Sequence, residues 1–168
     1  MYNKWNMIAN LSASDEIIGK NSYRRDLVNG QSARLVCGYI YASAGDGEST
    51  QDVVYSGHNL IAENGRILSE SKEFSEEMIV TELDVKRLMA DRRRMTTFEV
   101  DSYSSDKKFH ISVDFNIEAG KTELTRGVAP MPFVPSSKTD RDKRCEEILT
   151  IQARGLKKRL EHIGCQSA

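Results

Sequence analysis

The sequence has few residues of the kinds that build metal centres and disulfide-linked scaffolds. Of its 168 residues, three are cysteine and three are histidine. Cys37, Cys145 and Cys165 form no Cys-x-x-Cys pair, and no histidine is adjacent to a cysteine. We therefore expect neither a disulfide framework nor a zinc site, and an odd number of thiols is typical of a reducing, cytoplasmic compartment.

An excess of charge of either sign is also missing. Lys and Arg number 24 against 25 Asp and Glu, and residues 1–98 carry 12 basic and 14 acidic side chains. Binding to a nucleic-acid backbone needs a basic excess, so nucleic acid is not an expected partner. No stretch reaches the roughly 20 apolar residues of a membrane span, so no membrane partner is expected and the expected location is the cytoplasm.

Sequence signals of a catalytic nucleophile or a phosphate-binding loop are absent as well. Gly45-Asp46-Gly47-Glu48 lacks the spacing of the Walker and Rossmann fingerprints. Cys37 lies among Leu35, Val36 and Tyr39, which predicts a small buried hydrophobic residue and not an activated thiolate. The histidines are far apart, so a Ser-His-Asp or Cys-His site has no local support.

Hydrophobic residues make up 39% of the chain, enough for a packed core, and their order predicts an α/β fold. A helix is predicted from a cap at Ser22 to Cys37, and a short helix after a cap at Asp84. Asn64-Gly65 predicts a hairpin between two of the strands. The predicted strands share β-rich or alternating sequence and are residues 7–11, 38–42, 58–62, 66–70, 79–83 and 109–115.

A different organisation is predicted near the C-terminus. All three prolines of the chain fall within residues 130–135, which predicts an extended connector and a domain edge. Ser137 begins a Ser-x-x-Asp capping box, and apolar residues then recur at helical spacing up to Gly164. This long helix has an apolar face that needs a partner.

The best place for a binding site is the loop after the first predicted strand, because α/β folds bind ligands at the carboxyl ends of strands. There Ser14 can hydrogen-bond a ligand, Lys20 can pair with a carboxylate, and Gly19 allows a tight turn before the helix. On these residues alone, the favoured interpretation is an ordinary strand-to-helix loop with a solvent-exposed lysine.

Several strings taken together resemble the glutaminase domain of glutamine-dependent NAD synthetases. They include Asn10-Leu11-Ser12-Ala13-Ser14, Ile17-Ile18-Gly19-Lys20, Tyr23-Arg24-Arg25, Gly47-Glu48-Ser49-Thr50 and Arg92-Arg93-Arg94-Met95. The resemblance implies a partial nitrilase-like fold of the carbon-nitrogen hydrolases, an α-β-β-α sandwich with a C-terminal linker helix. It implies the C-terminal half of the glutaminase domain at residues 7–98, a linker at 99–135, and at 136–168 a helix leading into an ATP-dependent synthetase domain.

The resemblance also implies which residues act. The match begins after the position of the family's catalytic Cys. The family's catalytic Glu, Lys and Cys are therefore expected outside this sequence, and we expect no catalytic residue and no metal ligand within it. Ser14 and Lys20 correspond to residues that hold glutamine. Some relatives have Arg where Lys20 stands, and a lysine offers a point charge in place of a planar fork. Glu48, Ser49 and Thr50 shape a pocket or a domain contact, or form a turn held by their side chains.

The implied parent enzyme hydrolyses glutamine and uses the ammonia, with ATP and magnesium, to make NAD from deamido-NAD. The segment itself is expected to bind no cofactor, to be inactive alone, and to have as partners glutamine, the missing N-terminal half and the synthetase domain. An incomplete domain exposes apolar surface and a sheet edge, so a homo-oligomer is also expected. The alternatives are a fragment of another nitrilase-superfamily amidase and a non-enzymatic binding module.

Overall fold

The computed structural model of the chain describes residues 6–96, 111, 113–118, 120, 123–127, 130–131 and 133–165. The chain divides into two compact units, Met1–Arg126 and Gly127–Ala168, which are described separately. No helix in the described ranges is both long enough and apolar enough to span a bilayer.

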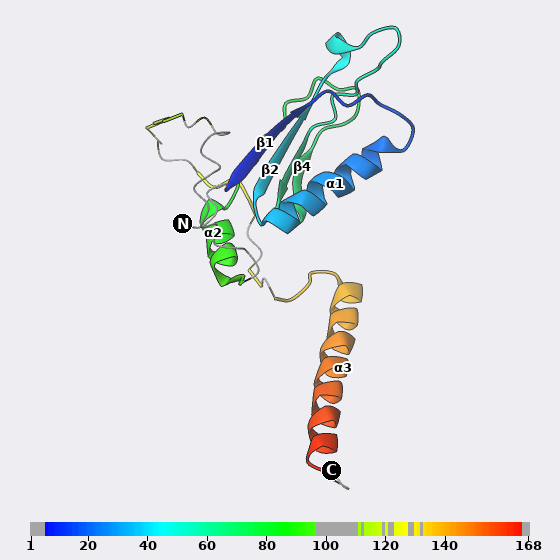
Figure 1. The fold of residues 1–168 in the computed structure, drawn as a ribbon, viewed down its shortest axis with the longest axis vertical. Helices are drawn as coiled ribbons and strands as arrows, with labels where there is room; N and C mark the ends of the chain where they lie inside the picture. Colours follow the sequence, from blue (N-terminus) through cyan, green and yellow to red (C-terminus); the bar gives the residue numbers. More distant parts are fainter. Residues whose placement is uncertain are drawn as a thin grey trace. The chain divides into compact units, whose positions relative to one another are not determined.

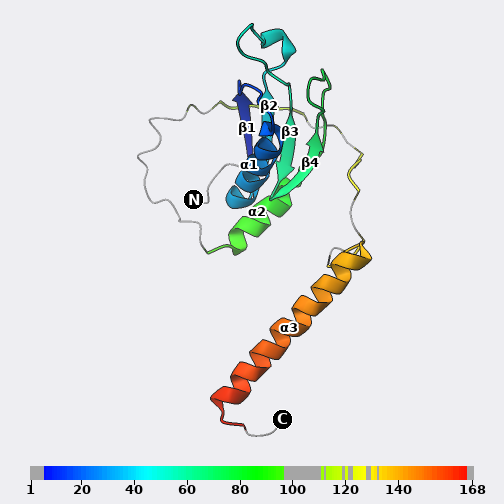
Figure 2. The ribbon, with the colours of Figure 1, turned by 90° about the vertical axis from the view of Figure 1, so that its right-hand side faces the viewer.

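The first unit is built on a mixed four-stranded sheet in the order β1-β2-β3-β4 (Figure 2). Strand β1 (Met7–Ser12) is parallel to β2 (Gly38–Ser43), with Leu11 beside Ala42. The α/β class and the strands predicted at residues 7–11 and 38–42 are thus confirmed.

Strands β3 (Leu60–Glu63) and β4 (Arg66–Glu70) form the predicted antiparallel hairpin, and β3 is antiparallel to β2. The turn residues Asn64 and Gly65 have φ values of 44° and 80°. Both lie in the left-handed region that a two-residue hairpin turn requires, which explains the strength of the Asn-Gly signal.

Helix α1 (Lys20–Leu35) lies against one face of this sheet (Figure 1). Its Val28 packs in a buried cluster with Tyr41, Leu60 and Ala62. The predicted cap at Ser22 is wrong, because Gly19, with a φ of 84°, takes the N-cap position and starts the helix at Lys20. The helix also ends at Leu35 and not at Cys37, because Val36 adopts a left-handed conformation.

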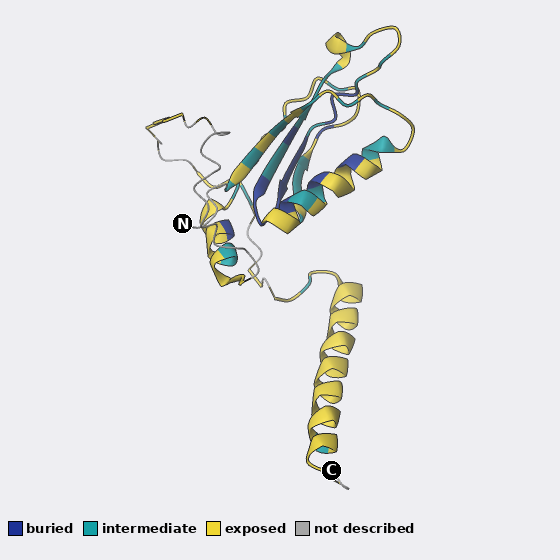
Figure 3. Cartoon of the chain, in the orientation of Figure 1, coloured by how far each residue is buried: buried dark blue, intermediate teal, exposed yellow. Residues whose placement is uncertain are grey.

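The opposite face of the sheet carries apolar side chains of β1. Met7 and Leu11 pair with Gly38 and Ala42, so they alternate with the residues that face α1. Leu11 is 86% exposed and Met7 50%. Figure 3 shows exposed positions along β1, whereas β2 beside it is largely buried or intermediate. Within the described part of the first unit, α1 therefore covers one face of the sheet, and the β1 end of the other face is open.

The strand predicted at residues 79–83 is wrong. These residues form no strand, although half-buried Ile79 and Thr81 flank an exposed Val80. A Cβ atom on Gly38 would lie 2.8 Å from Leu83 Cδ1, so the segment ends with Leu83 packed directly on β2. The alternating pattern reflects packing of side chains on the sheet and not pairing along a strand edge.

Helix α2 (Val85–Arg94) begins as predicted at Asp84, whose Oδ1 accepts a hydrogen bond from Arg87 N at 2.9 Å. Its Leu88 is buried. Of the strand predicted at 109–115, residues 109, 110 and 112 lie outside the described residues, and those that are described form no strand.

In the second unit, helix α3 spans Lys138–His162. Ser137 caps it, as predicted, by accepting a hydrogen bond from Asp140 N at 3.4 Å. The apolar residues Ile148, Ile151 and Leu156 of this helix are exposed.

Candidate functional site

The loop between β1 and α1 holds both predicted site residues. Ser14 is half-buried in the loop, and Lys20 is the first residue of α1. Lys20 Nζ donates to Asp15 Oδ1 at 2.8 Å and also to the Asp15 carbonyl oxygen. The hydrogen bond and the charge of Lys20 hold the pKa of Asp15 below its ordinary value. An anion that binds Lys20 must therefore share the Lys20 ammonium group with Asp15.

A cavity of about 500 Å³ lies at the carboxyl ends of β1 and β2. Its lining includes Leu11, Ala13, Glu48 and Tyr55. It therefore adjoins the loop along the chain, but Ser14 and Lys20 are not among its lining residues. That Ser14 and Lys20 hold glutamine stays a prediction.

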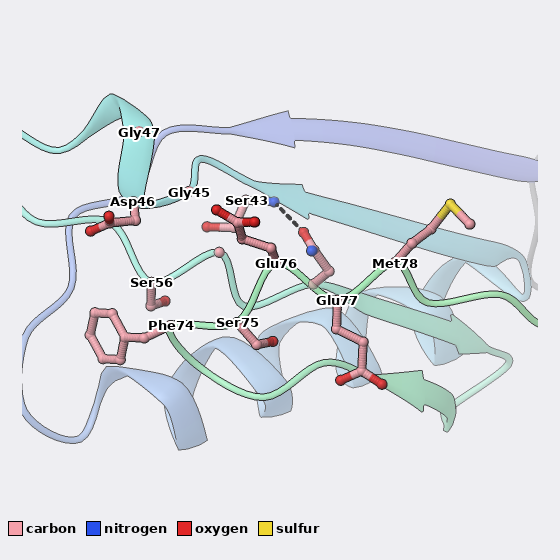
Figure 4. A pocket seen from close by; sticks show the side chains of 12 residues that line it. Ser43, Gly45, Asp46, Gly47, Ser56, Phe74, Ser75, Glu76, Glu77 and Met78 are labelled. Atoms are coloured by element: carbon pink, nitrogen blue, oxygen red, sulfur yellow. Dashed lines mark hydrogen bonds between the residues drawn. The ribbon is translucent and has the colours of Figure 1, made fainter.

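A second cavity, of about 690 Å³, is rich in hydrogen-bond acceptors (Figure 4). Asp46, Glu76 and Glu77 contribute carboxylates to its lining. Ser43 N donates to Asn59 Oδ1 at 2.9 Å, the bond drawn dashed in Figure 4. Carboxylates repel a bound carboxylate, so this cavity is unsuited to an amino acid's acid group.

The segment that contains Glu48, Ser49 and Thr50 is a turn held by these side chains. Glu48 closes a single 3₁₀ turn, Asp46–Glu48, and its Oε2 accepts from Gly45 N at 3.2 Å. Ser49 Oγ accepts from Tyr55 N at 3.0 Å, and Thr50 Oγ1 accepts from Val53 N at 3.2 Å. Of the two interpretations of this string, the structure thus shows the turn, while Glu48 in addition lines the smaller cavity.

Behind the loop lies a buried polar network that the sequence interpretation missed. Arg24 and His58 are 3% and 0% exposed. Arg24 NH2 is 2.6 Å from Glu16 Oε2, and Arg24 NH1 is 3.0 Å from His58 Nδ1. Arg24 precedes the buried Val28 by four residues, and this helical spacing is the signal that could have predicted its burial.

The other end of the network is a carboxylate shared by two donors. His58 Nε2 is 2.9 Å from Glu70 Oε1, and Arg25 Nε donates to Glu70 Oε2 at 2.9 Å. Since an arginine only donates, His58 Nδ1 accepts from Arg24, and His58 carries its proton on Nε2 and donates it to Glu70.

Both carboxylates of the network are held in the charged form. Burial by itself would raise the pKa of Glu16, but hydrogen bonds from Ser56 and Arg24 together with the Arg24 charge hold that pKa below its ordinary value. Burial likewise opposes ionisation of Glu70, and the hydrogen bonds from Arg25 and His58 lower its pKa. Along the network, the negative charges of Glu16 and Glu70 therefore alternate with the positive charges of Arg24 and Arg25, and the neutral imidazole of His58 lies between Arg24 and Glu70.

Cys37 is not an activated thiol, and the described residues form no metal cluster. Cys37 is 1% exposed, and burial raises the pKa of its thiol, as expected for a buried hydrophobic residue. Among the described residues there is no group of three or more His, Cys, Asp and Glu side chains that could hold a metal ion.

Comparison with known proteins gives a consistent result. The glutamine-dependent NAD(+) synthetase of Mycobacterium tuberculosis (strain ATCC 25618 / H37Rv) is 38% identical over 161 residues, which cover 92% of this chain and 24% of that protein. The chain is homologous to a segment of these synthetases. The Mycobacterium leprae (strain TN) synthetase is 36% identical over 165 residues, with the same coverage. The resemblance predicted from the sequence is confirmed, and the chain spans about a quarter of the length of these relatives.

No protein-family model matches the chain. Among solved structures, the glutamine-dependent NAD(+) synthetase of Cytophaga hutchinsonii is 35% identical, with a TM-score of 0.40 over 43% of this chain and 12% of that one. The Acinetobacter baumannii enzyme, solved with ADP, is 19% identical, with a TM-score of 0.40 over 43% of this chain and 14% of its own. Both superpositions are partial, so the homology is defined by sequence.

Proposed function

We propose that this chain is part of a glutamine-dependent NAD(+) synthetase and contributes to the domain that releases ammonia from glutamine. The observation that carries the proposal is the 38% identity over 161 residues to such synthetases. In the parent enzyme, the ammonia would convert deamido-NAD to NAD, with ATP and magnesium bound by a separate synthetase domain. The segment itself would bind neither, and the cytoplasm is its expected location.

On this proposal, residues 7–98 are the C-terminal half of a nitrilase-like α-β-β-α sandwich. The open sheet face opposite α1, with exposed Met7 and Leu11, supports this architecture, because a second sheet can pack on it. Residues 99–135 would be the linker, and 136–168 the helix that leads into the synthetase domain. The same open face, if left unpaired, would drive association of two copies of the chain.

Ser14 and Lys20 would hold the glutamine. An ammonium group has three donors, and Lys20 directs two contacts to Asp15. One donor is left for the α-carboxylate of glutamine, while the Ser14 hydroxyl can donate to or accept from the substrate's polar groups.

The covalent chemistry would belong to residues outside this chain. In the family resemblance, a Cys thiolate attacks the glutamine amide to form a thioester, a Glu acts as the base, and a Lys stabilises the oxyanion. Cys37 does not fit the nucleophile's role, because its side chain is buried and its pKa is raised. We therefore propose that the segment binds glutamine weakly and does not hydrolyse it.

A titration of the isotope-labelled chain with L-glutamine, followed by NMR, tests the binding half of this proposal. We expect saturable shifts of the amides of residues 13–20, and weaker binding in Ser14→Ala and Lys20→Met. Lys72→Met, which removes an exposed lysine next to β4, is the matched control and should leave the affinity unchanged. Shifts confined to other parts of the chain, or equal affinity in all variants, would contradict the assignment of Ser14 and Lys20.

A further inference from the structure

The loop that carries Ser14 and Lys20 is fixed near its middle by Glu16. Glu16 N donates to Val54 O at 2.7 Å, so its backbone is tied to a segment more than thirty residues away in sequence. Its Oε2 accepts from Arg24 NH2 at 2.6 Å and from Ser56 Oγ at 2.5 Å. Backbone and side chain are therefore held from two directions, by α1 and by residues 54–56.

Arg24 is in turn held by a neutral side chain, which does not compete with Glu16 for the positive charge of Arg24. Its NH1 donates to the neutral Nδ1 of His58, a side chain that is 0% exposed. Glu70 holds the other side of the His58 ring at 2.9 Å and is itself held by Arg25. The guanidinium of Arg24 therefore has one fixed orientation, with NH2 directed at the loop.

Stability alone does not account for these residues. Glu16 Oε1 and Arg24 Nε are buried and have no hydrogen-bond partner. Each such atom costs folding free energy, and a buried ion pair is often no more stable than apolar residues of similar volume. What the network provides is a defined position for the residues on either side of Glu16.

We propose that Glu16, Arg24 and His58 are positioning residues that hold the loop from Ser14 to Lys20 in its glutamine-binding conformation. This rests on the proposed function, because it takes Ser14 and Lys20 as the glutamine contacts. A loop that is ordered before binding does not lose that conformational entropy when the ligand arrives, so pre-ordering raises affinity without any new contact to the ligand. None of the three residues needs to touch glutamine.

Glu16→Ala tests the proposal, because it removes the carboxylate from the loop and changes no residue of the sheet or of α1. Glu16→Gln is the conservative variant, since its amide oxygen still accepts from Arg24 and Ser56. Glu73→Ala is the matched control, an exposed glutamate outside the network. Two quantities are measured on the full 168-residue chain: hydrogen exchange of each backbone amide, and the affinity for L-glutamine.

In Glu16→Ala we expect exchange at the Glu16-to-Lys20 amides to rise by roughly tenfold or more, with a clearly smaller rise in β2 and β3 from the unpaired charge of Arg24, and with a loss of glutamine affinity comparable to the rise in the loop. Glu16→Gln should lose less of both, and Glu73→Ala neither. Unchanged loop exchange in Glu16→Ala, or faster exchange spread evenly over the sheet, would overturn the positioning role. If the wild-type chain binds no glutamine, the proposed function fails, and the exchange data by themselves decide whether the network orders the loop.

Discussion

Arg126 forms a bidentate ion pair with Glu63, with NH1 2.9 Å from Oε2 and NH2 2.9 Å from Oε1. Glu63 is 6% exposed at the end of β3, and Oε2 also accepts from Asp84 N at 2.7 Å. Thr125 N and Arg126 N donate to the two carboxylate oxygens of Glu82. The last residues of the first unit are thus attached to the sheet and to the start of α2 by two carboxylates.

Replacing Arg126 by methionine should destabilise the first unit by about 2 kcal/mol or more, because it leaves the buried Glu63 carboxylate without its bidentate partner. Urea denaturation of the purified chain measures this change. Arg93→Met, at an exposed position in α2, is the matched control and should change stability by less than about 0.5 kcal/mol. Equal effects of the two substitutions would show that the Arg126 contact is not formed in solution.

Acid should destabilise the fold through three partly buried carboxylates. The pKa values of Glu16, Glu63 and Glu70 lie below their ordinary value of 4.5, in each case because hydrogen bonds and nearby charges outweigh burial. A carboxylate whose pKa is lowered in the folded state stabilises the fold. This stabilisation is fully present above about pH 4.5 and is lost as the pH falls through the folded-state pKa. Through these three carboxylates, the urea midpoint should therefore decline below that pH. The decline should be shallower in Arg126→Met, since the pKa of Glu63 is then no longer lowered by Arg126.

The tautomer of His58 is a direct test of the buried network. Because Arg24 donates to Nδ1, the imidazole should carry its proton on Nε2. The ¹⁵N chemical shifts of the two ring nitrogens distinguish this form from the other tautomer and from imidazolium. His162, which lies in α3 and is exposed, provides the reference within the same chain. A proton on Nδ1 would mean that Arg24 does not face His58 in solution.

Two glycine substitutions should have opposite effects. Gly65 has a φ of 80°, and an added Cβ would lie 2.9 Å from Ala33 Cβ, so Gly65→Ala should destabilise the hairpin by about 1–3 kcal/mol. Gly30 lies within α1, and nothing is within 4 Å of an added Cβ, so Gly30→Ala should stabilise the helix by up to about 1 kcal/mol. Thermal unfolding of the two variants compares them. Destabilisation by Gly30→Ala would indicate that this face of α1 is covered in solution.

The features that the sequence predicts well are those set by neighbouring residues. Asn64-Gly65 fixes its own turn, and Asp84 caps a helix through a side chain that reaches only three residues along the chain. Residues 79–83 have the alternating sequence of a strand, and a strand was wrongly predicted there. A strand forms only when it pairs with the edge of another strand, whereas side chains of this segment pack on the face of the sheet. The alternation alone cannot distinguish these two arrangements.

The buried network could not be predicted in the same way. The sequence places Arg24 on a helix and His58 at the start of a predicted strand, but their contact depends on how α1 packs against residues far along the chain. An arginine is usually exposed, so residue type argued against burial. The start of α1 was missed for a local reason, because the left-handed conformation of Gly19 replaces the expected serine cap.

The purified chain by itself should release no ammonia from glutamine. Hydrolysis needs a thiolate within hydrogen-bond reach of a base, and Cys37 is 1% exposed with a raised thiol pKa. Cys145 and Cys165 belong to the second unit, at α3 and just after it. Holding glutamine at Ser14 and Lys20 would orient it without opening a covalent route to the products.

The measurement is ammonia release during prolonged incubation with L-glutamine, with Cys37→Ala as the control. Turnover that disappears in Cys37→Ala would identify Cys37 as the nucleophile and contradict the proposed division of labour. Ammonia release that appears only after addition of a separately expressed N-terminal half would support that division.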